Sequence, residues 1–118
     1  MIAGVFIYNV LSALVEGRVY PDEVGESDDQ TTPYIVYQDI SNIPEITMEG
    51  VTGHEWVRMQ IDVYHHDKYA GVLLANKVIQ LINDNSISAI YGGKVSSKDG
   101  ALYRQMIEYE FWQTADTE

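Results

Sequence analysis

The chain has 118 residues, of which 46% are hydrophobic and 21% charged, the composition of one globular domain and not of a disordered chain. Its 7 Lys and Arg residues against 18 Asp and Glu residues give a formal net charge of −11 at pH 7. A protein that binds the phosphate backbone needs the opposite sign, so the charge disfavours nucleic-acid binding. The absence of cysteine excludes disulfide bonds, thiolate zinc sites and thiol nucleophiles.

The first fifteen residues carry no charge and predict an amphipathic helix that Gly17 ends. One side of this helix is apolar, with Ala3, Phe6, Ile7, Val10, Ala13 and Leu14. Val5, Tyr8 and Leu11 lie off that side, so they either form a second contact surface or are scattered exposed apolar residues. The segment lacks the positively charged start of an export signal and is too short to span a bilayer, so we interpret it as an ordinary helix.

Acidic residues concentrate in the next part of the chain, which holds no basic residue between Arg18 and Arg58. Nine acidic residues fall in this interval: Asp22, Glu23, Glu26, Asp28, Asp29, Asp39, Glu45, Glu49 and Glu55. The first five belong to residues 22–33, which lose apolar periodicity and gain Gly, Ser and Thr. These features predict a solvated acidic loop.

Residues 18–21 are expected to form a short extended piece, and residues 34–43 a strand, because the latter are β-branched and aromatic. Pro44 is expected to end that strand, and residues 44–53 to form a long connection. The clearest strand covers residues 57–64, where apolar and polar residues alternate strictly. One side of this strand therefore faces a core, and the other faces water or a partner.

Asp67 is a suitable N-cap for a second helix, in which apolar residues recur at helical spacing over 68–85. A short strand is expected within residues 87–95, followed by a turn over 96–100 and a last strand over 102–113. The order is α-β-β-α-β-β. It predicts one α+β domain over the whole chain, with an antiparallel four-stranded sheet and two helices packed on one face.

The most enzyme-like pattern is His65-His66-Asp67, because two imidazoles and a carboxylate are suitable ligands for a divalent metal. Neighbouring strand residues point to opposite faces, however, so the two histidines share an ion only if the strand has already ended. The alternative is a polar strand end followed by a helix cap. The chain also lacks a Gly-x-Ser-x-Gly nucleophile motif and a phosphate-binding glycine loop. We therefore expect no enzyme, no metal site and no cofactor.

Tyrosine is unusually common, with nine Tyr against two Phe. It suits protein interfaces, where one end of the side chain is packed and the other is wet, but it also suits half-buried strands. Both interpretations stay open. The candidate residues for a subunit or partner interface are Val5, Tyr8, Leu11, Tyr34, Tyr37, Tyr64, Tyr103 and Tyr109.

Several short motifs follow the N-terminal helix in a recognisable order. They are Arg18-Val19-Tyr20-Pro21, Pro33-Tyr34-Ile35-Val36-Tyr37 with Ile40-Ser41, Arg58-Met59-Gln60-Ile61-Asp62-Val63-Tyr64 before a helix, and Glu108-Tyr109-Glu110-Phe111. In this order and spacing, the chain from about Met1 to Trp112 resembles the tail terminator, or tail completion, family of tailed bacteriophages and prophages, of the siphophage type. The acidic residues 22–29 match no motif of this family.

The resemblance implies a non-enzymatic virion protein that forms a ring, typically of six subunits, on the head-proximal end of the tail tube. Such a ring stops polymerisation of the tube and joins the tail to the neck. The expected partners are further copies of the chain, the major tail tube protein and a neck or head-tail connector protein. The expected location is the virion tail, and the host cytoplasm during assembly.

An acidic ring would repel DNA and let it pass through the lumen without specific binding. Two alternatives remain at this point. The chain is another head-tail connector or minor tail component of similar fold, or a small metal-dependent enzyme that uses His65, His66 and Asp67.

Overall fold

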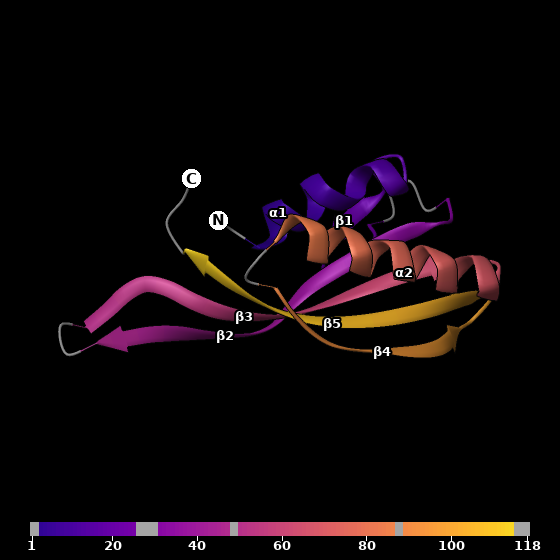
Figure 1. The fold of residues 1–118 in the computed structure, drawn as a ribbon. Helices are drawn as coiled ribbons and strands as arrows, with labels where there is room; N and C mark the ends of the chain where they lie inside the picture. Colours follow the sequence, from indigo (N-terminus) through magenta and orange to yellow (C-terminus); the bar gives the residue numbers. More distant parts are fainter. Residues whose placement is uncertain (1–2, 26–30, 48–49, 87–88, 115–118) are drawn as a thin grey trace.

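Two helices cover one face of a five-stranded sheet, and within the described residues no helix lies on the other face (Figure 1). The structure is a computed structural model that describes residues 3–25, 31–47, 50–86 and 89–114. In chain order its elements are α1 (Ala3–Leu11), the 3-10 helix η1 (Ser12–Leu14), β1 (Val19–Pro21), β2 (Tyr34–Thr47), β3 (Gly50–His65), α2 (Lys68–Asn85), β4 (Ile90–Asp99) and β5 (Leu102–Thr114). The order of strands across the sheet is β1-β2-β3-β5-β4.

The predicted α+β class and the helices on one face are confirmed, but the predicted antiparallel four-stranded sheet is wrong. The sheet has a fifth strand, β1, which pairs with β2 in parallel, with Val19 opposite Ile35. The other neighbouring strands are antiparallel. A strand of three residues is too short to show period-2 alternation, and a partner sixteen residues away leaves no local signal, so the sequence predicts only an extended piece here.

The predicted end of β2 at Pro44 is also wrong. β2 continues to Thr47 and β3 begins at Gly50, so the expected connection over residues 44–53 is mostly paired strand. Proline is tolerated because no described strand pairs with the outer edge of β2 beyond Tyr37, and the ladder shifts its register between Pro44 and Ile46. The result is a long β-hairpin that projects beyond the helices (Figure 1).

Two other boundaries differ from the prediction. β4 runs through the expected turn over residues 96–100 as far as Asp99, because its polar residues pair with β5 along the whole strand. The first helix does not continue to Gly17: α1 ends at Leu11 and tightens into η1. Gly17 then turns the chain with a φ of 83°, a conformation that glycine adopts at little cost.

The core lies between the helices and the covered face of the sheet. Its fully buried members include Ile7 and Leu11 of α1, Val78 and Ile82 of α2, and Tyr109 of β5. α1 lies close to the sheet because Gly4 has no side chain: a Cβ atom there would lie 3.2 Å from Cε2 of Tyr37. We call the opposite face of the sheet, which no helix covers within the described residues, the helix-free face.

Candidate functional site

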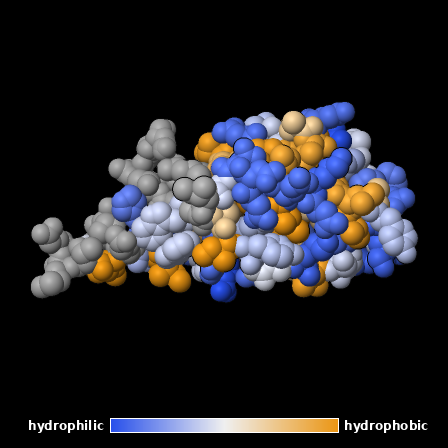
Figure 2. All heavy atoms as spheres, viewed as in Figure 1, coloured by the Kyte–Doolittle hydropathy of each residue, from blue (hydrophilic) through white to orange (hydrophobic). Residues whose placement is uncertain are grey.

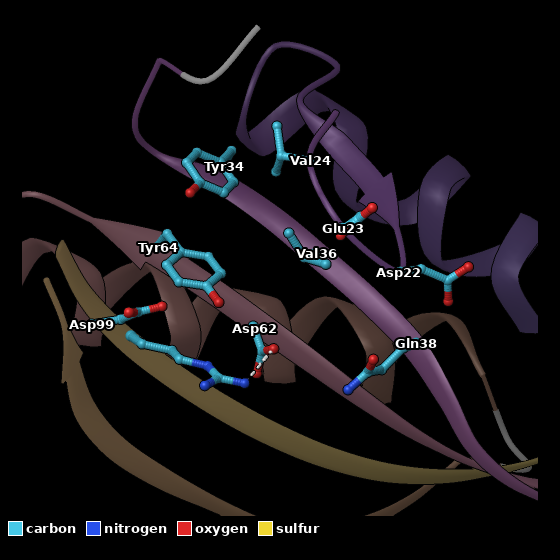
Figure 3. A pocket seen from close by; sticks show the side chains of 10 residues that line it. Asp22, Glu23, Val24, Tyr34, Val36, Gln38, Asp62, Tyr64 and Asp99 are labelled. Carbon is cyan, nitrogen blue, oxygen red and sulfur yellow. Dashed lines mark hydrogen bonds and ion pairs between the residues drawn. The ribbon is translucent and has the colours of Figure 1, made fainter. Parts of the chain in front are cut away.

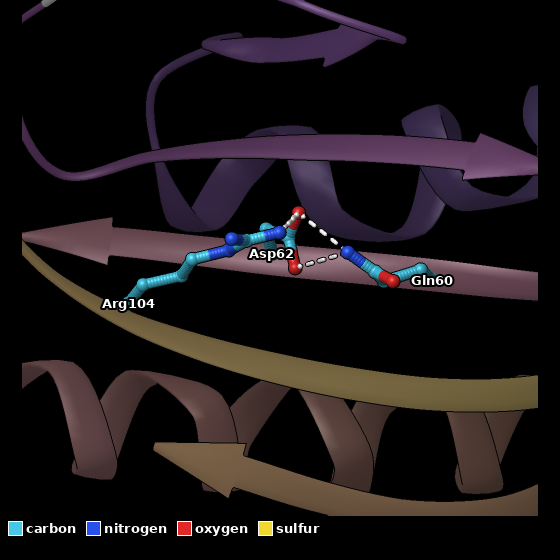
Figure 4. Close-up of polar contacts among 3 residues, drawn as sticks. All are labelled: Gln60, Asp62 and Arg104. Carbon is cyan, nitrogen blue, oxygen red and sulfur yellow. Dashed lines mark hydrogen bonds and ion pairs between the residues drawn. The ribbon is translucent and has the colours of Figure 1, made fainter. Parts of the chain in front are cut away.

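A buried ionic cluster occupies the centre of the helix-free face (Figure 4). Nη2 of Arg104 on β5 donates to Oδ2 of Asp62 on β3 at 2.9 Å, and the Asp62 side chain is only 5% exposed. Nε2 of Gln60 donates to both carboxylate oxygens, at 3.1 and 3.0 Å. The hydrogen bond to Asp62 raises the pKa of the Arg104 guanidinium, so this guanidinium stays charged, and the contact fixes β3 against β5.

Three tyrosines extend this cluster across the neighbouring strands. The rings of Tyr34 and Tyr64, which face each other on β2 and β3, stack with centroids 5.0 Å apart. Tyr20 on β1 meets Tyr34 edge-on at 6.4 Å, and the Arg104 guanidinium lies 5.9 Å from the Tyr64 ring. Burial raises the pKa of Tyr34 and of Tyr64, which keeps both hydroxyls protonated as possible donors.

A concave site of about 350 Å³ lies beside these tyrosines (Figure 3). Its lining consists of Asp22, Glu23, Val24, Tyr34, Val36, Gln38, Asp62, Tyr64, Asp99 and Arg104. Four carboxylates against one guanidinium make this concavity acidic. Of the predicted acidic loop, Asp22 and Glu23 reach this site, whereas Glu26, Asp28 and Asp29 lie outside the described residues.

The helix-free face changes character toward the projecting hairpin. Arg58 contacts Glu108 at 3.3 Å and Glu110 at 3.6 Å, and all three side chains are about half exposed. Beyond them the rings of Trp56 and Trp112, which face each other on β3 and β5, lie 5.1 Å apart. The face therefore passes from tyrosines and carboxylates to an exposed ion-pair cluster and then to tryptophans.

The projecting hairpin, residues 38–47 of β2 and 50–57 of β3, is here called the hairpin arm. Ile40, Ile43 and Ile46 of the arm are 47%, 63% and 68% exposed, and Trp56 is 39% exposed. Apolar side chains follow the lower side of the arm in Figure 2. Exposed apolar side chains grouped on one projecting element are typical of a surface that contacts another protein.

A model of the family described as Tail completion protein gp17 matches residues 8–114 of the chain. The chain belongs to this family. Among solved structures, it is similar to a chain of the "Virion of native gene transfer agent (GTA) particle", with a TM-score of 0.64 and 15% sequence identity. That likeness covers 93% of this chain and 92% of the other, and it shows a shared fold. No curated protein matches the sequence.

Membership identifies the chain as a structural component of a bacteriophage tail. It points to a protein without catalytic activity. Across residues 3–25, 31–47, 50–86 and 89–114, no helix is both long and apolar enough to cross a membrane.

In this tail completion protein, the residues predicted for an interface do not form one surface. Tyr34 and Tyr64 meet on the helix-free face. Val5 and Tyr8 are 56% and 45% exposed on α1, and Tyr37 is half-buried below that helix. The half-buried Tyr103 lies under the ammonium group of Lys98 at 5.5 Å.

Leu11 and Tyr109, by contrast, have no exposed surface in the folded chain. The Tyr109 hydroxyl donates to Oδ1 of Asn83 at 2.9 Å and to the Ile79 carbonyl at 3.3 Å, so it fixes α2 on the sheet. These two side chains belong to the core, so the other six predicted residues remain as candidates for the interface.

The three metal-ligand candidates are engaged in local structure. Oδ1 of Asp67 accepts from the Ala70 N–H at 3.0 Å, which is the predicted N-cap of α2, and the Asp67 N–H donates to Nδ1 of His65. Nδ1 of His66 lies 3.0 Å from Oγ1 of Thr32. Within the described part of the chain, no three His, Asp or Glu side chains gather closely enough to hold a metal ion.

Sequence reasoning missed the apolar surface of the hairpin arm. Ile40, Ile43 and Ile46 recur every third residue, a spacing typical of neither a strand nor a helix. Two register shifts in the β2–β3 ladder, at 39/41 and 44/46, disturb the strand period. The apolar content of the segment is the one sequence feature that indicates this surface, and the proline and glycines there predict a connection instead.

Proposed function

We propose that the chain forms a ring of six subunits on the head-proximal end of the tail tube. There it stops tube polymerisation and joins the tail to the neck. The observation that carries this proposal is the hairpin arm, on which Ile43 and Ile46 are 63% and 68% exposed. Projecting apolar surface of this kind is unfavourable in water, and contact with a neighbouring subunit or with the tube removes that cost.

Ring formation has a geometric requirement that the fold can meet. A closed ring of identical subunits uses heterologous interfaces, in which two different patches of each chain meet. The hairpin arm and the β4 edge are two such patches, because they lie at opposite sides of the sheet. Val5, Tyr8, Tyr34, Tyr37, Tyr64 and Tyr103 are the proposed further contacts to neighbouring subunits, the tube protein or the neck protein.

The charge fits a channel through which DNA passes without binding. Six copies at −11 carry a formal charge of about −66 before any counterion binds. We place part of this acidic surface on the lumen, where it repels the phosphate backbone. A ring structure with a neutral or basic lumen would remove this part of the proposal.

The test is the length of tail tubes assembled from purified tube protein with and without the chain. The proposal predicts uncontrolled tube lengths without the chain and capped, shorter tubes with it. Ile43→Lys combined with Ile46→Lys should abolish capping, whereas Leu73→Lys, at a side chain 65% exposed on α2, should leave it intact. Unchanged tube lengths with the wild-type chain would refute the capping role, and would favour another connector or minor tail component of the same fold.

A further inference from the structure

The two edges of the sheet differ in charge. On the β1–β2 side, Asp22, Glu23 and Asp39 lie in a stretch without any basic residue between positions 18 and 58; we call this side the acidic edge. On the opposite side, Lys98 of β4 lines one pocket together with Lys68, the first residue of α2, and Lys94 lies further along β4. We call these three lysines, with β4, the basic edge. The basic edge holds three of the seven basic residues of a chain whose net charge is −11.

These charges are not neutralised within the described part of the chain. Nζ of Lys94 donates to Oδ1 of Asn76 at 3.0 Å, and Lys98 lies over the Tyr103 ring, so neither lysine contacts a carboxylate there. On the acidic edge, burial and the nearby carboxylates of Asp22 and Glu55 raise the pKa of Asp39. A cationic surface brought against the acidic edge would relieve this repulsion, and a carboxylate brought against the lysines would pair with them.

Both edges also offer unpaired strand backbone. β1 covers β2 only as far as Tyr37, so residues 38–47 have no described strand on their outer side. β4 is the last strand at the opposite side, and its outer edge, residues 90–99, is likewise unpaired within the described chain. Unpaired edges of similar length are templates for strand addition between chains.

The basic edge contains a pocket of about 200 Å³ suited to a carboxylate. Its lining is Lys68, Ser96, Ser97, Lys98, Tyr103 and Gln105. Gln105 is only 1% exposed, and its Oε1 accepts from Oγ of Ser96 at 2.8 Å while its buried Nε2 has no hydrogen-bond partner in the described chain. A buried amide N–H without an acceptor is costly, so the pocket favours a ligand that supplies a hydrogen-bond acceptor. The ammonium groups of Lys68 and Lys98 at the same pocket favour an acceptor that carries negative charge.

We propose that a second copy of this chain docks head to tail, with its acidic edge against the basic edge of the first copy and one of its carboxylates in the pocket at Gln105. The proposal rests on the ring function and names the surfaces that join the subunits. Two different edges meet at each contact, so every docked copy leaves one free edge of each kind for the next copy. This is the requirement for closing a ring.

The experiment uses two neutralised variants of the whole chain. One is Lys68→Gln/Lys94→Gln/Lys98→Gln, which removes the basic edge, and the other is Asp22→Asn/Glu23→Gln/Asp39→Asn, which removes the acidic edge. Lys77→Gln and Asp84→Asn, both on α2 at a separate concavity that includes Leu14, are the matched controls. Sedimentation velocity measures association, and circular dichroism verifies folding.

The wild-type chain and both controls should self-associate, with affinity falling at least about tenfold between about 50 and about 500 mM NaCl. Each neutralised variant alone should be monomeric, and an equimolar mixture should give a one-to-one dimer, because each variant supplies the edge that the other lacks. Self-association of either variant at wild-type strength, or a mixture that stays monomeric, would overturn the proposal. So would a wild-type chain that is monomeric at low salt.

The tube-length assay separates this inference from the ring function. If neutralised variants still cap tubes as the wild-type chain does, the ring function stands and the edge-to-edge contact is wrong. If the wild-type chain associates through its edges but fails to cap tubes, the contact stands and the capping role is wrong.

Discussion

Replacing Arg104 with methionine tests whether the nearly buried Asp62 carboxylate on the helix-free face needs its ionic partner for the stability of the fold. Methionine keeps an unbranched apolar stem but lacks the guanidinium that donates to Asp62 at 2.9 Å. The Asp62 side chain is 5% exposed, so the substitution leaves a nearly buried charge with Gln60 as its remaining described side-chain donor. A buried charge without its ionic partner is a strongly destabilising change.

The structure allows the magnitude to be worked out. Removing one member of a fully buried ion pair costs about 3–5 kcal/mol. The Arg104 side chain is 26% exposed, and Gln60 continues to donate, so we expect the free energy of unfolding to fall by about 2–3 kcal/mol. The matched control is Arg58→Met: its ion pairs with Glu108 and Glu110 are about half exposed, so the expected loss is below about 1 kcal/mol.

Urea denaturation followed by tryptophan fluorescence measures both losses. Adding Asp62→Asn to Arg104→Met should recover at least about 1 kcal/mol, because no buried charge then remains. Two results would contradict this reasoning: a loss of unfolding free energy for Arg104→Met no larger than that for Arg58→Met, or a double variant less stable than Arg104→Met alone. Either result would mean that Arg104 does not stabilise the fold by compensating the buried charge of Asp62.

Three further predictions concern single contacts. Tyr109→Phe removes the hydroxyl that donates to Asn83, so it should cost about 1 kcal/mol in urea denaturation. Burial raises the pKa of Tyr109 from 10.0 to about 12, so the stability that its protonated hydroxyl contributes is present below pH 10.0 and lost as the pH rises toward 12. Over that interval the Tyr109→Phe variant should therefore lose less of its free energy of unfolding than the wild type. An equal loss in both proteins would contradict the reasoning. The hydrogen bond from the backbone N–H of Ala70 lowers the pKa of Asp67 from 3.8, so the stability that the ionised Asp67 contributes is present above pH 3.8 and lost as the pH falls further. Asp67→Asn keeps a capping oxygen but does not ionise, so the melting temperature of this variant should fall less at acid pH than that of the wild type. An equal fall in both proteins would refute the prediction. Gly93 has a φ of 129°, so Gly93→Ala should cost about 1–3 kcal/mol, and a variant as stable as the wild type would show that β4 relaxes there.

The parts of the fold that the sequence predicted have strong local signals. Residues 57–64 alternate because one face of β3 packs under the helices and the other faces outward, and Val57, Met59, Ile61 and Val63 are all buried. Asp67 was predictable because an N-cap acts within one helical turn. Short-range chemistry of this kind is visible in a single sequence.

The missed parts depend on partners far along the chain. The parallel pairing of β1 needs Ile35, which no local pattern of residues 18–21 indicates. The strand through Pro44 is possible because β1 ends at Pro21, opposite Tyr37, and leaves the arm an open edge, a tertiary fact that overrides the usual effect of proline.

The candidate site shows the same division. The tyrosine content indicated an interface, but only pairing across strands brings Tyr34 to Tyr64, and only packing assigns Tyr109 to the core. The ion pair between Asp62 and Arg104 joins residues 42 positions apart, so no local pattern indicates it. The excess of acidic residues is visible in the sequence, but the strand order is needed to see that acidic and basic residues lie at opposite edges of the sheet.

Electron cryomicroscopy of virions that contain the chain tests the central claim most directly. The account predicts a single ring of this chain between the end of the tail tube and the neck, with the hairpin arm of each copy, including Ile43 and Ile46, buried against a neighbouring subunit or the tube. Density for the chain at any other position in the virion, or a ring whose hairpin arms remain exposed to solvent, would contradict it.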